Sequence, residues 1–157
     1  MRKRNQAGAY QNDLFAGLLS DPKIQKLKNY PQHRTTNTYE HSKHVTETCL
    51  KWSHNRGMSI DEETLIRATM LHDYYLYHIE DKGLNAWQHG TRHAQIAVNN
   101  ASSDFKLSEK EKEIMLSHMW PLNITKIPKS KEAWLICLAD KICALEEEFF
   151  WQKKMKE

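Results

Sequence analysis

The sequence predicts an all-α protein with a single domain, built as a bundle of helices. Its 157 residues are enough for one domain with its own hydrophobic core. Glycines number only five and prolines four, and no run alternates apolar and polar residues as a half-buried strand does. Capping motifs mark the starts of several helices instead, so we expect helices joined by short connections.

The N-terminal half should contain three helices after a polar, partly irregular start. In Asp21-Pro22 an N-cap residue precedes a proline that suits the first helical turn. The motif SIDE, from Ser59 to Glu62, has the spacing of a capping box. The expected segments are an irregular stretch over 1–20 with an apolar patch at Leu14, Phe15, Leu18 and Leu19, and helices over 22–29, 38–54 and 59–75.

The C-terminal half should contain three more helices. Ser108 and Glu111 form a second capping box. The expected segments are a loop over 80–90, a helix over 91–103, a helix from 108 that ends before Pro121, a loop over 121–129, and a long helix from Ser130 nearly to the end. At that end, Phe149, Phe150 and Trp151 are expected to pack within the same chain, while docking on a second chain, and so a homodimer, stays open.

The composition is typical of a globular domain and does not favour a membrane or nucleic-acid-binding protein. Hydrophobic residues make up 39% and charged residues 27%, with a net charge of +3, as in a soluble globular domain. There is no basic tract with interleaved aromatic residues, so nucleic acid is an unlikely partner. No stretch approaches the roughly 18–20 apolar residues of a membrane span, and the basic MRKR start lacks the apolar segment of a signal peptide. Three cysteines without a CxxC pair then suit reduced thiols and a cytoplasmic location.

Side chains that bind metals recur on the apolar faces of the helices. Taken singly, a histidine there is more often a hydrogen-bonded core residue, but an unpaired buried carboxylate costs roughly several kcal/mol. Imidazole and carboxylate together are ligands that suit divalent metals, which would neutralise the acids. The set consists of His41, His72, Asp73, His93, His118 and Asp140.

The order of these residues resembles the HD superfamily of metal-dependent phosphohydrolases. The resemblance makes 1–157 a single HD domain, with its core over about 35–147 and a helical N-terminal extension over 1–34. It looks closest to small bacterial stand-alone HD proteins, including a group that hydrolyses diadenosine tetraphosphate. The matching segments are YEHSKHV with His41, TMLHDY with His72 and Asp73, HGTRHAQIA with His93, IMLSHMWPL with His118, and LICLADKI with Asp140.

The resemblance implies a catalytic centre with one or two divalent metals, which could be Fe, Mn, Zn, Ni, Co or Mg. One metal would be held by His41, His72, Asp73 and Asp140, and the other by Asp73, His93 and His118, so that Asp73 bridges. A metal-bound hydroxide would then attack the phosphorus of a small-molecule phosphate ester or anhydride, in particular a nucleotide. The residues expected to bind that substrate are Arg34, Lys43, His89, Arg92 and Lys141.

Several alternatives stay open. Many members of the superfamily continue the pair as HDxxK or HDxGK, whereas this chain reads HDYYLY, which leaves the substrate open. His89 lies four residues before His93 and could face the same site in its place. The same ligand set serves dimetal oxygenases, so di-iron oxygenase chemistry is one alternative function. A non-catalytic nucleotide-binding module is another, and a helical adaptor with core histidines is the third.

Overall fold

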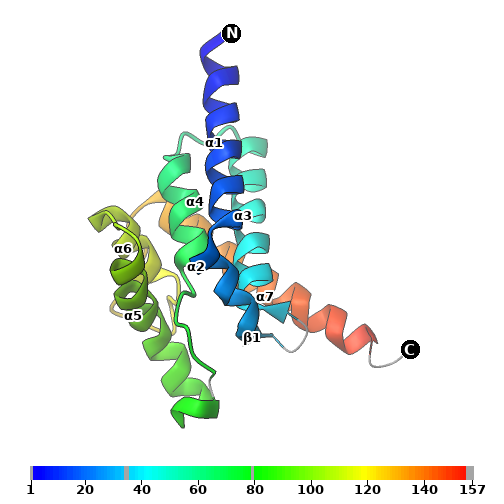
Figure 1. Ribbon diagram of the computed structural model, residues 1–157, viewed down its shortest axis with the longest axis vertical. Coiled ribbons are helices and arrows are strands. Elements are labelled where there is room, and N and C mark those ends of the chain that lie inside the picture. The colour runs from blue at the N-terminus through cyan, green and yellow to red at the C-terminus, as the bar shows by residue number, and fades with distance from the viewer. Residues whose placement is uncertain (1, 34–35, 79, 155–157) are drawn as a thin grey trace.

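The computed structural model of the protein describes the backbone of residues 2–33, 36–78 and 80–154 (Figure 1). Within these ranges, side chains are described from residue 11 to 150 and at Lys153. Helices dominate the described chain, which confirms the prediction of an all-α single domain. The elements are α1 (Arg2–Ser20), α2 (Pro22–Gln25), η1 (Lys26–Asn29), β1 (Pro31–Gln32), β2 (Thr36–Asn37), α3 (Thr38–Asn55), α4 (Glu62–Leu71), η2 (Glu80–Lys82), α5 (Ala86–Asp104), α6 (Glu109–Ser117) and α7 (Lys131–Lys154).

The helices form one bundle with α4 near its middle. Helix α4 packs on α1, α3, α6 and α7, while α3 also packs on α7, and α5 packs on α6. Figure 1 shows α5 and α6 on one side of α4 and α1 and α3 on the other, with α7 crossing behind. The core contains the fully buried side chains of Val45, Leu65, Ile66, Met70, Ile114 and Ile136. The packing therefore brings together the helices that carry the predicted metal-binding residues.

The N-terminal segment forms a continuous helix, which agrees with the helical extension implied by the resemblance, whereas the expectation of a partly irregular stretch over 1–20 was wrong. Helix α1 runs from Arg2 to Ser20, and its C-terminal part packs on α4. The apolar patch predicted there lies against the core, with Leu18 buried. Packing of that patch stabilises a helix whose sequence alone has little apolar periodicity.

Two helices start at other residues than predicted. Helix α4 is capped by Asp61 and not by Ser59, because the Asp61 carboxylate accepts hydrogen bonds from the N–H and hydroxyl of Thr64. Helix α5 starts at Ala86, so the predicted loop over 80–90 ends earlier. Its start is fixed by a capping box between Asn85 and Gln88, a signal that the sequence analysis missed.

Helix α4 also ends at Leu71 and not at about Tyr75. The N–H of Tyr74 still reaches the carbonyl of Leu71, but the side chain of Asn100 on α5 binds the carbonyls of Tyr74 and Tyr75. A tertiary contact therefore replaces the helical hydrogen bonds that would have continued α4. As a result, the His72–Asp73 pair lies where the helix gives way to an irregular segment.

Other expected elements agree with the structure. Helix α3 covers the predicted helix over 38–54, α6 starts at the Ser108 capping box, and α7 runs from Lys131 to Lys154. The hairpin formed by β1 and β2 was not predicted, since each strand has only two residues. Among the described residues, no helix is both long and apolar enough to cross a lipid bilayer.

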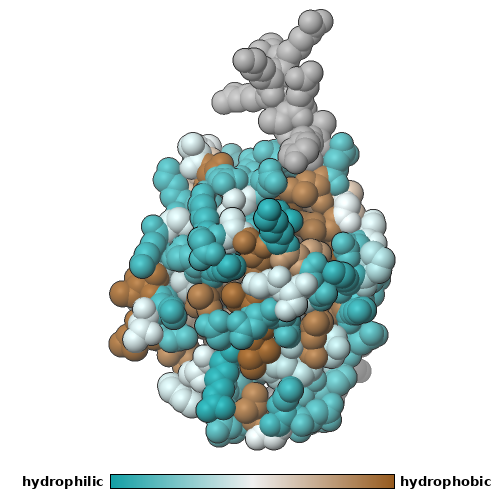
Figure 2. Space-filling view, turned by 60° about the vertical axis from the view of Figure 1, so that its left-hand side comes forward, coloured by the Kyte–Doolittle hydropathy of each residue, from teal (hydrophilic) through white to brown (hydrophobic). Residues whose placement is uncertain are grey.

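The surface combines hydrophilic side chains with apolar ones. The face in Figure 2 is mainly hydrophilic, with hydrophobic groups between the polar ones and gathered at one edge. Phe149 and Phe150 are each 66% exposed, so the prediction that they pack within the same chain was wrong. They lie on the C-terminal part of α7, which extends beyond the other helices in Figure 1. The side chain of Trp151 lies outside the described residues.

Candidate metal centre

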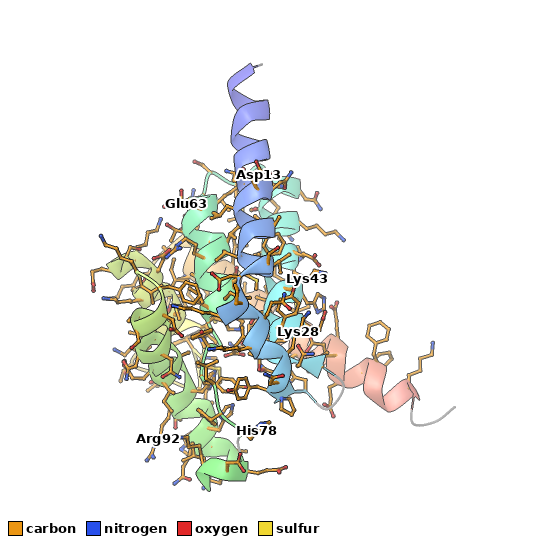
Figure 3. The ribbon with its side chains drawn as sticks, in the orientation of Figure 1. Asp13, Lys28, Lys43, Glu63, His78 and Arg92 are labelled. Atoms are coloured by element: carbon orange, nitrogen blue, oxygen red, sulfur yellow. The ribbon has the colours of Figure 1, made fainter. Side chains whose placement is uncertain are left out.

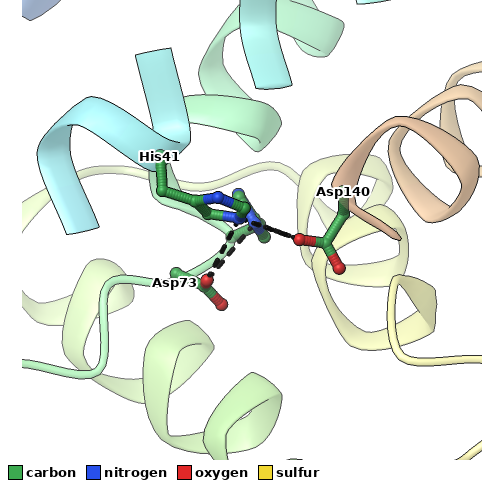
Figure 4. Close-up of side chains that lie close together, drawn as sticks. His41, Asp73 and Asp140 are labelled. Carbon is green, nitrogen blue, oxygen red and sulfur yellow. Dashed lines mark hydrogen bonds and ion pairs between the residues drawn. The ribbon is translucent and has the colours of Figure 1, made fainter. Parts of the chain in front are cut away.

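The first group of predicted ligands meets between α3, the end of α4, and α7. The Nε2 atom of His41 lies 2.9 Å from Asp140 Oδ1 and 3.9 Å from Asp73 Oδ2 (Figure 4). The Nε2 atom of His72 lies 3.4 Å from Asp73 Oδ2 and 3.5 Å from Asp140 Oδ1. All four side chains are buried, and one ligand atom from each lies within 4.8 Å of the others. The spacing suits four atoms around a single cation.

A second group shares the same aspartate. The Oδ1 atom of Asp73 lies 3.2 Å from His93 Nε2, on α5, and 3.6 Å from His118 Nε2, at the end of α6. The two Nε2 atoms lie 3.0 Å from one another. Asp73 therefore turns Oδ2 toward His41 and His72 and Oδ1 toward His93 and His118. One carboxylate connects two clusters of imidazoles.

The backbone orients three of the four imidazoles. The Nδ1 atoms of His72 and His118 each lie 2.6 Å from the carbonyl oxygen three residues earlier, of Thr69 and Met115. The Nδ1 atom of His93 lies 2.9 Å from the carbonyl oxygen of His89, four residues earlier. A carbonyl oxygen only accepts, so each Nδ1 must carry the proton. When such a ring is neutral, its Nε2 lone pair points into the cluster, as in metal-binding histidines.

The electrostatics of the cluster suit a cation. Burial alone would raise the pKa values of Asp73 and Asp140, yet the neighbouring histidines hold both well below the ordinary range. Burial likewise would lower the pKa of His41, but hydrogen bonds with Asp140 and Glu147 raise it to about 10. Burial and the neighbouring His72 and His93 lower the pKa of His118 to about 3. The carboxylates are thus ionised, and positive charge on the first group of imidazoles is favourable.

Unsatisfied polar atoms test whether a metal fits these residues. His72 Nε2 and Asp73 Oδ1 are buried without a hydrogen-bond partner among the described residues. Among the described residues, no lysine or arginine forms an ion pair with Asp73 or Asp140. Buried lone pairs and charges of this kind are costly unless a cation or a donor compensates them. The donor set and its charge therefore fit one or two divalent metals.

Glu147, which contacts His41 from the side opposite Asp140, was not among the predicted site residues. Both oxygens of the Glu147 carboxylate accept from His41 Nδ1, at 3.1 Å and 3.0 Å. Thr36 also donates to Glu147, and His44 Nδ1 lies 3.1 Å from it. The carboxylate fixes the ring of His41 as the carbonyls fix the other imidazoles. A signal was present, since Glu147 follows Asp140 by seven residues, or two helical turns, and so shares its face of α7.

Gln32 was also missed. Its Nε2 atom donates to Asp73 Oδ2 at 2.6 Å, and its Oε1 atom accepts from the Tyr75 hydroxyl at 2.8 Å. The neighbouring His33 places its ring 4.8 Å from that of His41. The β1–β2 hairpin thereby contacts the cluster. No sequence signal pointed to Gln32, because its position depends on how a two-residue strand packs.

The structure separates the residues that were predicted to bind the substrate. His89 stacks on His93 with ring centres 4.8 Å apart, and burial together with His93 lowers its pKa to about 4. The Nζ atom of Lys141 donates to the carbonyl oxygen of His118 at 2.9 Å, and so lies beside the cluster. Lys43 and Arg92 lie on opposite sides of the view in Figure 3. Arg92 is exposed, Lys43 lies 3.9 Å from Glu47, and Arg34 lies outside the described residues.

An all-α bundle that buries two groups of imidazoles around a shared carboxylate defines a class of helical metal-binding proteins. A comparison with protein-family models matched the HD domain over residues 38–145. This match covers more than half of the chain, so the protein belongs to the HD domain family, as its motifs predicted. That family is a superfamily of metal-dependent hydrolases. Searches of curated proteins and of solved structures gave no match.

Proposed function

We propose that the protein is a divalent-metal-dependent phosphohydrolase that acts on a phosphate ester or anhydride, in particular of a nucleotide. The observation that carries this proposal is the position of Asp73. Its Oδ2 atom lies 3.4 Å from His72 Nε2, and its Oδ1 atom lies 3.2 Å from His93 Nε2. A carboxylate shared in this way suits two metals at the separation used in hydrolysis of phosphate esters.

The side chains would hold the metals in two sets. His41, His72 and Asp140 complete one set with Asp73, and His93 and His118 complete the other. Bound divalent metals would supply Lewis acidity toward phosphoryl oxygens and would lower the pKa of water at the site. The protein contributes the orientation of each Nε2 atom and the dry surroundings, in which charges interact more strongly than in water.

We assign substrate contacts to His89 and Lys141 ahead of the other candidates. The Tyr77 hydroxyl lies 2.9 Å from His89 Nδ1. A neutral His89 that accepts there carries its proton on Nε2, where it can donate to a phosphate oxygen. The Nζ atom of Lys141 is held by the carbonyl oxygens of His118 and Cys137, at 2.9 Å and 3.1 Å, so it contributes positive charge at that position. Both groups lie beside the second set of ligands, where the non-reacting phosphates of a nucleotide would be held.

Metal content tests the proposal first. Protein purified without chelator should contain about two metals per chain by elemental analysis, and Asp73→Ala should lose them. His54→Ala is the matched control, because His54 is exposed and contacts Glu62 on the surface. A panel of phosphate esters and nucleotides should then give turnover with the wild type under anaerobic conditions. Absence of bound metal after reconstitution would refute the proposal of a metal-dependent phosphohydrolase. Turnover that requires O₂ and reduced iron would support the alternative of a di-iron oxygenase.

A further inference from the structure

The outer face of α7 carries a stripe of exposed apolar side chains. These residues are spaced by three or four along the helix, so they lie on one face. Their exposed fractions lie between 38% and 67%, and monomeric proteins rarely expose a contiguous patch of this kind. Asp140 and Glu147 lie on the opposite, buried face. The stripe consists of Trp134, Leu138, Ile142, Leu145 and Phe149.

The two ends of the stripe have complementary shapes. At the N-terminal end, Trp134 and Leu138 line an apolar groove of about 530 Å³ together with Trp52 and Met58. At the C-terminal end, α7 extends beyond the other helices (Figure 1), and Phe149 projects with 66% of its surface exposed. A groove and an aromatic side chain that could fill it therefore lie on the same helix face, since Trp134 and Leu138 precede Phe149 by 15 and 11 residues.

We propose that this face is the interface of an antiparallel homodimer, in which α7 of one copy packs along α7 of the other. A two-fold axis near Ile142 places Phe149 of each copy in the Trp52–Trp134 groove of its partner. The spacing supports this register, because Trp134 precedes Ile142 by eight residues and Phe149 follows it by seven. Every contact then occurs twice, as in isologous interfaces.

The exposed area is sufficient for a dimer. Large apolar side chains offer roughly 150–250 Å² each, so the stripe and Phe150 together expose on the order of 600 Å² per copy. A standard interface buries about 800 Å² per partner, to which the polar rim also contributes. Burial of apolar area at about 25 cal/mol per Å² then provides the main driving force.

Sedimentation equilibrium of the full chain tests the proposal. The wild type should be a dimer at micromolar concentrations, and Ile142→Glu should be a monomer, because the two carboxylates would meet at the axis. Ile127→Glu is the matched control, since Ile127 is 53% exposed in the loop before α7 and should stay dimeric. Circular dichroism should show that both variants are folded. A monomeric wild type, or a dimer that survives Ile142→Glu, would overturn the proposal.

Disulfide trapping tests the direction of the pair. Under mild oxidation Ile142→Cys should form a covalent dimer, because its two Cα atoms face one another at the axis. Lys153→Cys should not, since eleven residues of helix on each side place the two thiols roughly 33 Å apart. The native Cys49, Cys137 and Cys143 are buried, so the wild type under the same oxidation measures how much covalent dimer forms without an added cysteine. Efficient trapping through Lys153→Cys would indicate a parallel pair and contradict the assigned register.

Discussion

Asp140 and Glu147 hold the same imidazole from its two ends. Asp140 Oδ1 lies 2.9 Å from His41 Nε2, and Glu147 Oε2 lies 3.0 Å from His41 Nδ1. Both carboxylates come from one face of α7, two turns apart, so a single helix sets the position of the ring and the charge around it. A carboxylate behind a metal-binding histidine fixes its tautomer and makes the lone pair more basic.

Replacement of that carboxylate should weaken metal binding. We expect Glu147→Gln to lower metal affinity by about 10- to 100-fold, the usual cost when the partner of a histidine ligand is lost. Competition with a chromophoric chelator would measure the affinity. Glu109→Gln is the control, since the side chain of Glu109 is 89% exposed and pairs with Lys112. Equal affinities for the wild type and Glu147→Gln would show that Glu147 serves packing alone.

The two sets of ligands should be separable by mutation. His118 lies 3.6 Å from Asp73 Oδ1, the oxygen that faces away from His41 and His72. We therefore expect His118→Ala to contain about one metal per chain in place of about two, and His41→Ala to lose the other. Elemental analysis of both variants would measure this. Complete loss in His118→Ala would mean that the two sites bind cooperatively, and two retained metals would remove His118 from the ligands.

Metal removal should destabilise the folded chain. The cluster buries Asp73 and Asp140 without a lysine or arginine partner in the described ranges, so a cation should bind the native state and not the unfolded one. Free metal at about 100 times its Kd should add about 2.7 kcal/mol to the free energy of unfolding. Urea unfolding with and without a chelator would measure the change. In Asp73→Ala the chelator should have almost no effect, and an equal effect there would place the metal elsewhere.

The sequence predicted the cluster because metal-binding side chains recur on the apolar faces of the predicted helices. His41 shares an apolar helical face with Val45 and Cys49, and all three are buried in the structure. The order of the motifs then allowed His93 and His118 to be assigned as well, and the structure brings both to Asp73. Their convergence was implied by the resemblance to the HD superfamily, and their binding of metal stays a prediction.

The residues that support the cluster were harder to derive, although the seven-residue spacing between Asp140 and Glu147 was one available signal. Glu147 lies in the run EEE, which by itself indicates a solvated charged surface. Its burial depends on α7 packing against α3, a tertiary contact. Gln32 reaches Asp73 only because Pro31 and Gln32 pair with Thr36 and Asn37 in a short hairpin. The end of α4 was missed for the same reason, since the side chain of Asn100 terminates it from another helix.

A buried acid remote from the cluster should make stability depend on pH. Glu132 accepts a hydrogen bond from the backbone N–H of Asp61 at 2.7 Å and lies 3.3 Å from Lys110 Nζ. Burial opposes ionisation, but these contacts outweigh it and lower the pKa of Glu132 below its ordinary value of 4.5. The ionised form is therefore favoured by folding. Its contribution is present above about pH 4.5 and is lost as the pH falls through the lowered pKa.

Glu132→Gln should consequently reduce the free energy of unfolding by about 1 kcal/mol at pH 7, where a charge-assisted hydrogen bond and a partly exposed ion pair are weakened. The difference from the wild type should shrink as the pH is lowered below 4.5, because protonation removes the charge from the wild type as well. Urea unfolding of both proteins at pH 7 and at low pH would measure it. Glu109→Gln is the control, since the side chain of Glu109 is 89% exposed and should change little at either pH. A difference for Glu132→Gln that stays constant with pH would mean that the shape of the side chain, and not its charge, stabilises the contact between α7 and Asp61.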